Sequence, residues 1–224
     1  MFKFIEYNYT PSESIARIKR QLALYNPSEI PNKTLRYGQA VPKLTQYRYF
    51  TANSIPCPVW TQNAHLAKDW HSSGNVVYAR KERITARGQG ITLIYPINKW
   101  PGEDFLVYTK YIPNDREFRV NIFEDKFVNI REKLLLENYA TRSLVRSSDN
   151  GYTTTHHLPI PDTLKERIKL LALAAAEISS SSFKGVDIIY NEDEDKLYVL
   201  EVNSAPAIQG SSVGEYVSTM LGAE

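Results

Sequence analysis

Apolar and β-branched residues crowd two runs near the end of the chain, 185–190 and 197–203, and the run between them, 192–196, is strongly polar. This pattern predicts an antiparallel hairpin. If its loop is symmetric, Asp187 lies directly across from Glu201. Like charges opposite each other destabilise a sheet, so such a pair usually has a cation between the carboxylates or a raised pKa.

Asn203 follows Glu201 by two residues and therefore lies on the same face of the predicted hairpin. Two carboxylates and an amide oxygen suit Mg²⁺ or Mn²⁺. Asp187, Glu201 and Asn203 are therefore candidate metal ligands. The alternative is an ordinary sheet whose charged face is solvated, or one in which Glu201 pairs with a nearby arginine.

A second hairpin is predicted around the short turn 124–126, where apolar residues alternate with polar ones on both sides. Symmetric pairing sets Arg119 opposite Arg131 and Glu117 opposite Lys133. Two guanidinium groups on one face favour an anion, because their planar forks match phosphate or carboxylate oxygens in a bidentate way. A metal site and an anion site together suggest a nucleotide polyphosphate. A solvated charged face is again the alternative.

The rest of the chain alternates helices and strands. Apolar periodicity and capping residues predict helices over about 11–24, 43–52, 63–70, 162–178 and 211–221, and short strands over 35–37, 58–60, 75–80, 91–95 and 105–112. The polar segment 138–157 is expected to be a loop. This order predicts an α+β protein with largely antiparallel sheets.

A basic loop that ends in Gly88-Gln89-Gly90 lies between the strands predicted over 75–80 and 91–95. Glycines let backbone N–H groups close on phosphate oxygens, and a strand, loop and strand of this kind can fold over a triphosphate as a flap. A mobile surface turn is the other interpretation.

The composition is that of a soluble globular protein: 224 residues, 42% hydrophobic and 23% charged. A net charge of +2 without long Lys/Arg runs argues against nucleic acid as a partner. The single cysteine, Cys57, excludes an internal disulfide and a multi-cysteine zinc site. Because neither a secretion signal nor an apolar run of membrane-spanning length is visible, no membrane partner and a cytoplasmic location are expected.

Gly185-Val186-Asp187, followed by Val199-Leu200-Glu201-Val202-Asn203-Ser204-Ala205-Pro206, resembles the metal-binding end of ATP-grasp enzymes, particularly the RimK-like peptide and amino-acid ligases. The likeness extends upstream, in the right order and with compatible spacing, over roughly residues 43–216. Upstream, Lys43-Leu44 and Ile55-Pro56-Cys57-Pro58 resemble a helix and the following strand of those proteins, and 76–91 resembles their strand and glycine-rich flap. Further along, 107–112 resembles the hinge strand that holds adenine, and Glu117-Phe118-Arg119 resembles the strand with the catalytic arginine.

The resemblance implies the ATP-grasp fold, in which two α/β lobes with mainly antiparallel sheets enclose an ATP cleft. It divides the chain into a shortened N-terminal segment (1–42), an N-lobe with the flap (43–104) and a C-lobe with the metal site (105–224). The first segment is too short for the α/β domain that commonly precedes this fold. It has the size of a stub that docks on a partner protein or on a second copy of the chain.

The resemblance also implies roles for single residues. Asp187, Glu201 and Asn203 would bind one or two Mg²⁺ (or Mn²⁺) at the phosphates of ATP. The other expected nucleotide contacts are Lys43, Arg80 or Lys81, Gly88 and Gly90 at the phosphates, and Lys110, Tyr111 and Ile112 at the adenine. Arg80 stands where many relatives have a lysine, and Lys110 replaces the more usual acidic hinge residue.

Arg119 would stabilise the charge on the transferred phosphoryl group. Arg131 and Lys133 would hold the acyl phosphate or the carboxylate substrate. The loop residues Arg142, Arg146 and Asn150 either complete this anion pocket or belong to a solvated basic loop.

The implied activity is ATP- and Mg²⁺-dependent ligation of a carboxylate to an amine of an amino acid, peptide or protein, through an acyl-phosphate intermediate. One alternative is a kinase of the same fold. Another is a nucleotide-binding regulatory or structural protein without chemistry. The presence of Arg119 beside all three candidate metal ligands favours an enzyme.

Overall fold

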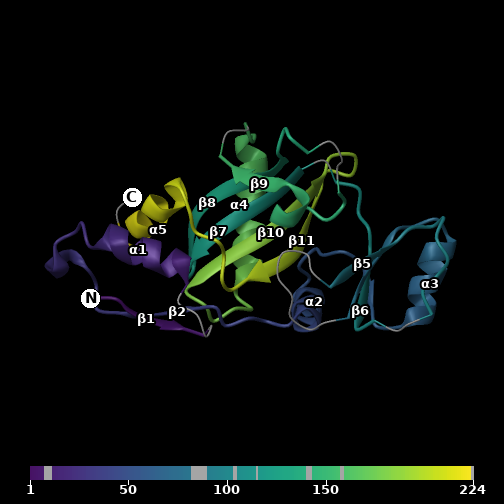
Figure 1. Ribbon diagram of the computed structural model, residues 1–224, viewed down its shortest axis with the longest axis horizontal. Helices are drawn as coiled ribbons and strands as arrows, with labels where there is room; N and C mark the ends of the chain where they lie inside the picture. The colour runs from purple at the N-terminus through teal and green to yellow at the C-terminus, as the bar shows by residue number, and fades with distance from the viewer. Residues whose placement is uncertain are drawn as a thin grey trace.

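The computed structural model describes residues 1–7, 12–81, 90–102, 105–114, 116–139, 143–156 and 159–222. Strands in these residues form sheets of two, five and four strands (Figure 1). Pairing is antiparallel throughout the two larger sheets and parallel in the smallest one. The architecture is therefore α+β with mainly antiparallel sheets, as predicted.

The five-stranded sheet contains both predicted hairpins. Its order is β11-β10-β7-β8-β9, formed by β7 (Arg116–Phe123), β8 (Lys126–Leu135), β9 (Tyr152–Thr155), β10 (Phe183–Asn191) and β11 (Lys196–Asn203). Because β10 pairs with β7 as well as with β11, the two hairpins lie side by side. The expectation of a loop over 138–157 was wrong in part, since β9 extends the sheet through a run of β-branched threonines.

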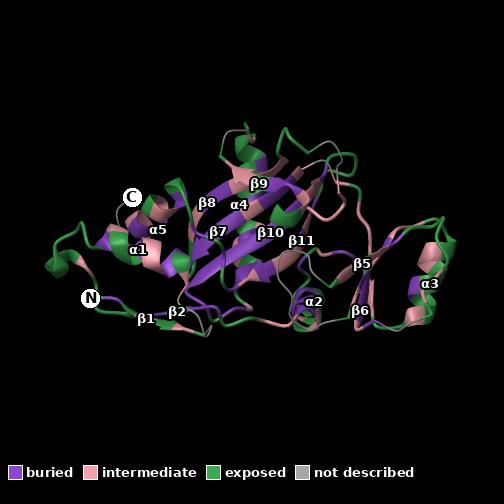
Figure 2. Ribbon diagram, viewed as in Figure 1, coloured by how far each residue is buried: buried purple, intermediate pink, exposed green. Residues whose placement is uncertain are grey.

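One face of this sheet is apolar and packs against α4 (Asp162–Ala176) and α2 (Lys43–Ala52). Val186 and Val120 are fully buried there together with Ile168 of α4 and Phe50 of α2. The central strands of the sheet are buried along most of their length (Figure 2). Because strand side chains alternate between faces, this packing turns the charged residues of the hairpins to the opposite face.

The four-stranded sheet has the order β3-β6-β4-β5, formed by β3 (Trp60–Thr61), β4 (Val77–Arg80), β5 (Ile91–Ile94) and β6 (Val107–Lys110). It packs against α3 (Ala64–Ser72), which begins where the Asn63 side chain accepts hydrogen bonds from two backbone N–H groups. Since β6 belongs to this sheet, strand pairing would place the second domain boundary after Lys110 rather than at 104. The division of the chain into domains stays a prediction.

The N-terminal segment forms a small unit at one end of the molecule. β1 (Lys3–Glu6) and β2 (Thr34–Tyr37) pair in parallel, and between them lie α1 (Glu13–Leu22) and a 3-10 turn, η1 (Pro27–Glu29). α1 packs on the last helix, α5 (Ser211–Leu221), through Ile15, Ile18 and Val217 (Figure 1). The two ends of the chain therefore share one hydrophobic core. Within the described ranges, no helix combines the length and apolarity needed to span a membrane.

Candidate active site

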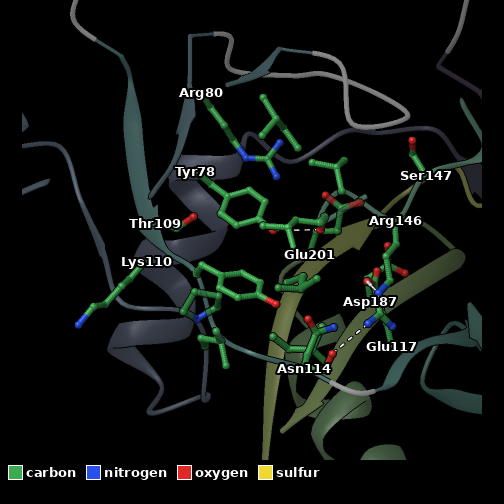
Figure 3. A pocket seen from close by; sticks show the side chains of 18 of the residues that line it. Tyr78, Arg80, Thr109, Lys110, Asn114, Glu117, Arg146, Ser147, Asp187 and Glu201 are labelled. Carbon is green, nitrogen blue, oxygen red and sulfur yellow. Dashed lines mark hydrogen bonds and ion pairs between the residues drawn. The ribbon is translucent and has the colours of Figure 1, made fainter. Parts of the chain in front are cut away.

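A cleft lies between the four-stranded and five-stranded sheets (Figure 3). Its lining comes from β4 and β6 on one side, from β7, β8, β10 and β11 on the other, and from the loop before β9. The lining includes Tyr78, Arg80, Tyr111, Ile112, Glu117, Lys133, Leu144, Arg146, Ser147, Asp187 and Glu201. Residues from all of these elements thus meet around one hollow.

A row of paired charged residues crosses the five-stranded sheet, and two of them, Glu201 and Asp187, line the cleft. Glu201 pairs with Asp187, Asp187 pairs with Arg119, and Arg119 pairs with Arg131. Both predicted pairings of like charges, Asp187 with Glu201 and Arg119 with Arg131, are therefore confirmed. The row also contains a pairing of opposite charges, because the two hairpins meet at Asp187 and Arg119.

Asp187 is buried, and two cations neutralise it. The Nε and Nη2 atoms of Arg119 donate to its two carboxylate oxygens, the second over 2.8 Å, and Lys133 Nζ donates to Oδ2 over 2.9 Å. Burial lowers the pKa of Arg119, but Asp187 outweighs that effect, so the net shift is upward. Arg119 was expected to face an anion, and in the structure that anion is the Asp187 carboxylate.

Glu201 pairs with a lysine. Lys43 Nζ lies 2.8 Å from Glu201 Oε2 and 2.9 Å from the carbonyl oxygen of Leu200, while Asn203 Nδ2 donates to Glu201 Oε1 over 3.1 Å. Burial opposes ionisation of Glu201, but Lys43 and then Arg80 outweigh it and hold its pKa well below the usual range. Burial also lowers the pKa of Lys43 to about 8, although Glu201 opposes this. The pair is therefore ionic at neutral pH.

Glu117 adds a third carboxylate to the cleft, one that the sequence did not single out as a site residue. Lys133 Nζ contacts Glu117 Oε1 over 2.5 Å, and Arg146 Nε lies 3.9 Å from Oε2. Burial, together with the nearby Asp187, raises the pKa of Glu117 despite the opposing effect of Lys133. Lys133 thus bridges two carboxylates, and its predicted pairing opposite Glu117 agrees with this contact.

The donor set around Asp187 fits a hard divalent cation that also takes ligands from phosphate. Mg²⁺ usually binds one or two carboxylates and fills its octahedron with water and phosphate oxygens. The described part of the chain has no arrangement of three or more His, Cys, Asp or Glu side chains suited to a metal. Asp187, Glu201 and the Asn203 amide supply oxygen ligands of the kind that Mg²⁺ takes, and their role as metal ligands stays a prediction.

Arg80 and Lys81, which competed for one role in the sequence, lie in different places. Arg80 lines the cleft, and its buried Nε has no hydrogen-bond partner among the described residues (Figure 3). Lys81 instead lies over the ring of Phe105, 5.5 Å from its centroid. Gly90 has a positive φ of 71° where the loop rejoins β5, a conformation that favours glycine. Gly88 lies outside the described residues.

Of the other predicted positions, Arg131 lies away from the cleft and Arg146 lines it. Arg131 donates to Ser211 Oγ over 2.9 Å at the start of α5 and does not line the cleft. Arg146 lines it and donates to the backbone oxygen of Asn114 over 2.9 Å. Asn150 donates to the backbone of Val145 over 2.7 Å and so shapes the loop. Arg142 lies outside the described residues.

The backbone of the predicted hinge strand, 107–112, forms hydrogen bonds with neighbouring segments of the chain. The N–H of Lys110 donates to Val59 and that of Tyr111 to Val76, each over 2.9 Å. The N–H of Lys110 is therefore already hydrogen-bonded, and its side chain points away from the cleft (Figure 3). Lys110, Tyr111 and Ile112 all line the cleft, and their contact with adenine stays a prediction.

Tyr78 is a cleft residue that sequence reasoning missed. Its ring stacks on that of Tyr111 with centroids 6.0 Å apart, and its hydroxyl donates to the backbone oxygen of Leu144 over 2.9 Å, which joins the two sides of the cleft. The alternation of residues in β4 could have identified it, because Val77 and Ala79 are buried in the core. Tyr78 alternates with them and so shares a face with Arg80.

Comparisons with known proteins find similarity both to a family model and to solved structures. A family model described as the RimK-like ATP-grasp domain matches residues 153–219. No curated protein matches the sequence.

Similar solved structures include D-alanine–D-alanine ligase from Bacillus anthracis, with a TM-score of 0.62 and 16% identity over 99% of this chain and 92% of that one. The ATP-grasp ligase PsnB in complex with a minimal precursor has a TM-score of 0.59 and 14% identity, covering 85% of this chain and 65% of that one. N5-carboxyaminoimidazole synthetase from Staphylococcus aureus in complex with ADP gives 0.57 and 13%, with 82% and 52% covered. The chain has the ATP-grasp fold, and its residues 153–219 match the RimK-like ATP-grasp domain.

Proposed function

We propose that this protein is an ATP- and Mg²⁺-dependent ligase that joins a carboxylate to an amine through an acyl phosphate. The observation that carries the proposal is the row of paired charges on the five-stranded sheet. Asp187 and Glu201 face each other across neighbouring strands, and Arg119 lies next in the same row. Two carboxylates beside a guanidinium group can hold a divalent cation and a phosphate chain together.

Asp187, Glu201 and Asn203 would hold the metal ion. When bound, Mg²⁺ would neutralise negative charge on the phosphate oxygens of ATP. Arg80 has a buried donor without a partner among the described residues and lines the cleft, so it supplies a phosphate contact. Lys43 contributes positive charge from behind Glu201. Tyr78, Tyr111 and Ile112 provide the apolar wall that an adenine ring requires.

The reaction needs charge stabilisation and positioning rather than covalent catalysis by the protein. A carboxylate oxygen of the substrate attacks the γ-phosphorus of ATP while the bond to the bridging oxygen breaks and ADP leaves. The amine nitrogen then attacks the acyl carbon, the phosphate departs and the nitrogen loses a proton. Arg119 and Lys133 lie within the same ion network and would stabilise the negative charge of the transferred phosphoryl group and the acyl phosphate.

The names of similar structures support an amino acid or peptide as the substrate class. D-alanine–D-alanine ligase is named for joining amino acids, and PsnB was solved with a precursor peptide. Because these proteins share little sequence identity with this chain, their similarity supports a class of reaction and not a particular substrate.

The proposal is tested by incubating the protein with ATP, Mg²⁺ and pooled amino acids or a host extract, and by measuring phosphate release beside mass spectrometry of the products. We expect a condensation product lighter than its two parts by one water, formed by the wild type and absent with Arg119→Ala. A phosphorylated product without condensation would show that the protein is a kinase. The absence of ATP consumption in all mixtures would favour a regulatory or structural role.

A further inference from the structure

The side chain of Arg119 runs over a glycine. A Cβ atom on Gly185 would lie 2.9 Å from Arg119 Cδ and 3.0 Å from Pro206 Cβ, distances at which something must move. Gly185 lies on β10, two residues before Asp187 and on the same face. The stem of Arg119 and the ring of Pro206 therefore fill the space above Gly185. They form a narrow channel that directs the guanidinium group to Asp187.

Pro206 belongs to the connection between β11 and α5, and the N-terminal segment holds it there. The hydroxyl of Tyr37, at the end of β2, donates to the Pro206 carbonyl oxygen over 2.9 Å. Ser14, in the first turn of α1, donates to the same oxygen over 3.3 Å. Both contacts are buried, so water does not compete for them.

The same segment holds the connection on either side of Pro206. Ser14 Oγ accepts from the N–H of Ile208 over 3.0 Å, and Arg17 donates to the carbonyl oxygen of Ile208 over 3.3 Å. Before Pro206, the N–H of Gly38 donates to the carbonyl oxygen of Ser204 over 2.9 Å. The connection that follows the candidate ligand Asn203 is thus fixed at three successive points by residues from 1–42.

We propose that the N-terminal segment is a positioning element of the active site, in which Ser14 and Tyr37 hold Pro206 so that Pro206 and Gly185 together orient Arg119. A long arginine side chain loses much conformational freedom when it is held in one place, and walls that restrict it beforehand lower that cost at the time of reaction. The importance of Arg119 for catalysis rests on the proposed function. The positioning of its side chain does not.

The first test observes Arg119 itself and needs no turnover. The Nε–Hε signal of Arg119 is followed by NMR in protein carrying ¹⁵N-labelled arginine and is assigned with Arg119→Lys. In Ser14→Ala/Tyr37→Phe, we expect the signal to shift and its hydrogen to exchange with water several-fold faster. The control Tyr198→Phe loses only an exposed hydroxyl bond to Glu194, at the far end of the β10-β11 hairpin, and should leave the signal unchanged.

Tyr37→Phe keeps the ring that packs against Phe183 at 5.9 Å, so this single variant decides the question if the double variant does not fold. An Arg119 signal that is identical in wild type and Tyr37→Phe, and in the double variant where that folds, would overturn the proposal. This holds whether or not the protein is a ligase. If the wild type consumes no ATP, the proposed function fails while this test remains decisive.

The second test compares two glycines. Gly185→Ala should lower kcat between about tenfold and a hundredfold while the KM for ATP changes little, because a displaced catalytic group slows the chemical step. Gly214→Ala is the matched control, since a Cβ there meets nothing within 4 Å. In an Arg119→Ala background the contact with Arg119 Cδ is gone and only that with Pro206 Cβ remains, so Gly185→Ala should lower the melting temperature by less than it does in the wild type. If Gly185→Ala lowers the melting temperature by the same amount with and without the Arg119 side chain, the proposed channel is contradicted.

Discussion

The guanidinium group of Arg119 donates two hydrogen bonds to the carboxylate of Asp187, its directly opposite neighbour across β7 and β10. The side chains are 20% and 3% exposed, so the pair is largely withdrawn from water. Lys133 adds a second positive charge to the same carboxylate. The metal candidate and the catalytic candidate are therefore coupled, and changing one alters the environment of the other.

Replacing Asp187 should reveal this coupling in stability. Asp187→Asn leaves Arg119 without its buried counter-ion and weakens the charge balance of Lys133, so the free energy of unfolding should fall by about 3 kcal/mol. Urea denaturation measures the change. The control Asp195→Asn removes an exposed partner of Arg167 and should cost less than about 1 kcal/mol. Equal losses in the two variants would mean that the Arg119 pair contributes little.

Arg119→Ala should separate binding from chemistry. Arg80 and Lys43 remain to attract the phosphates, so calorimetry should find ATP affinity within about tenfold of wild type. The ligation rate should fall by about a thousandfold or more, because the lost group stabilises charge that develops only during transfer. A variant that ligates at the wild-type rate would exclude Arg119 from catalysis.

Nucleotide affinity should depend on the protonation of Lys43. Its pKa is lowered to about 8, mainly by burial, so the ammonium is charged below that pH and neutral above it. A phosphate group attracts only the charged form, so ATP affinity should fall as the pH rises through about 8, and ATP binding near that pH should take up a proton. Calorimetry in buffers of different ionisation enthalpy measures both effects.

The matched variant for this prediction is Lys43→Arg, because a guanidinium group stays protonated throughout this range. It should flatten the dependence of ATP affinity on pH between about 7 and 9. A wild-type profile that is retained in Lys43→Arg would assign the titration to another group.

Tyr78 should contribute to closing the cleft. Tyr78→Phe keeps the stacked ring and removes only the hydrogen bond to Leu144, which joins β4 to the loop on the other side. One neutral hydrogen bond is worth about 0.5–1.5 kcal/mol, so ATP affinity should fall by roughly two- to tenfold. Tyr198→Phe should leave the affinity unchanged. Equal affinities of Tyr78→Phe and the wild type would show that this contact does not hold the cleft closed around ATP.

The pairing of Asp187 with Glu201 was predicted correctly, but the structure reaches it by a different route. Asn191 pairs with Lys196, so the turn is one residue shorter than the expected loop, and that register alone would set Asp187 opposite Leu200. A bulge next to Asp187 shifts the register by one and brings Glu201 into place. A slip of one residue would otherwise turn Glu201 to the other face.

The second hairpin repeats this compensation. Phe123 pairs with Lys126 around a tight turn in which Glu124 has a positive φ of 56°. A bulge next to Asn121 then restores the pairing of Arg119 with Arg131. Alternation of apolar and charged residues identified the faces that must be buried, and this fixes the register wherever one face packs against a core. The pattern did not show where a bulge absorbs the difference.

Contacts between distant segments escaped prediction for a related reason. Arg119 and Asp187 lie in different hairpins, and nothing within either hairpin shows that β7 and β10 are neighbours. The partner of Glu201 comes from α2, where Lys43 faces the sheet because the opposite side of that helix meets water. The strand β9 has too few apolar residues to stand out, and it is held mainly through its pairing with β8.

The central claim is that Asp187, Glu201 and Asn203 bind a divalent cation together with ATP. Calorimetric titration of ATP into the protein, in Mg²⁺ and in EDTA, tests it most directly when the wild type is compared with Glu201→Gln/Asn203→Ala. The wild type should bind at least about tenfold more tightly with Mg²⁺, a gain of about 1.4 kcal/mol, and the folded double variant should gain nothing. A double variant that keeps the full Mg²⁺-dependent gain would contradict the account.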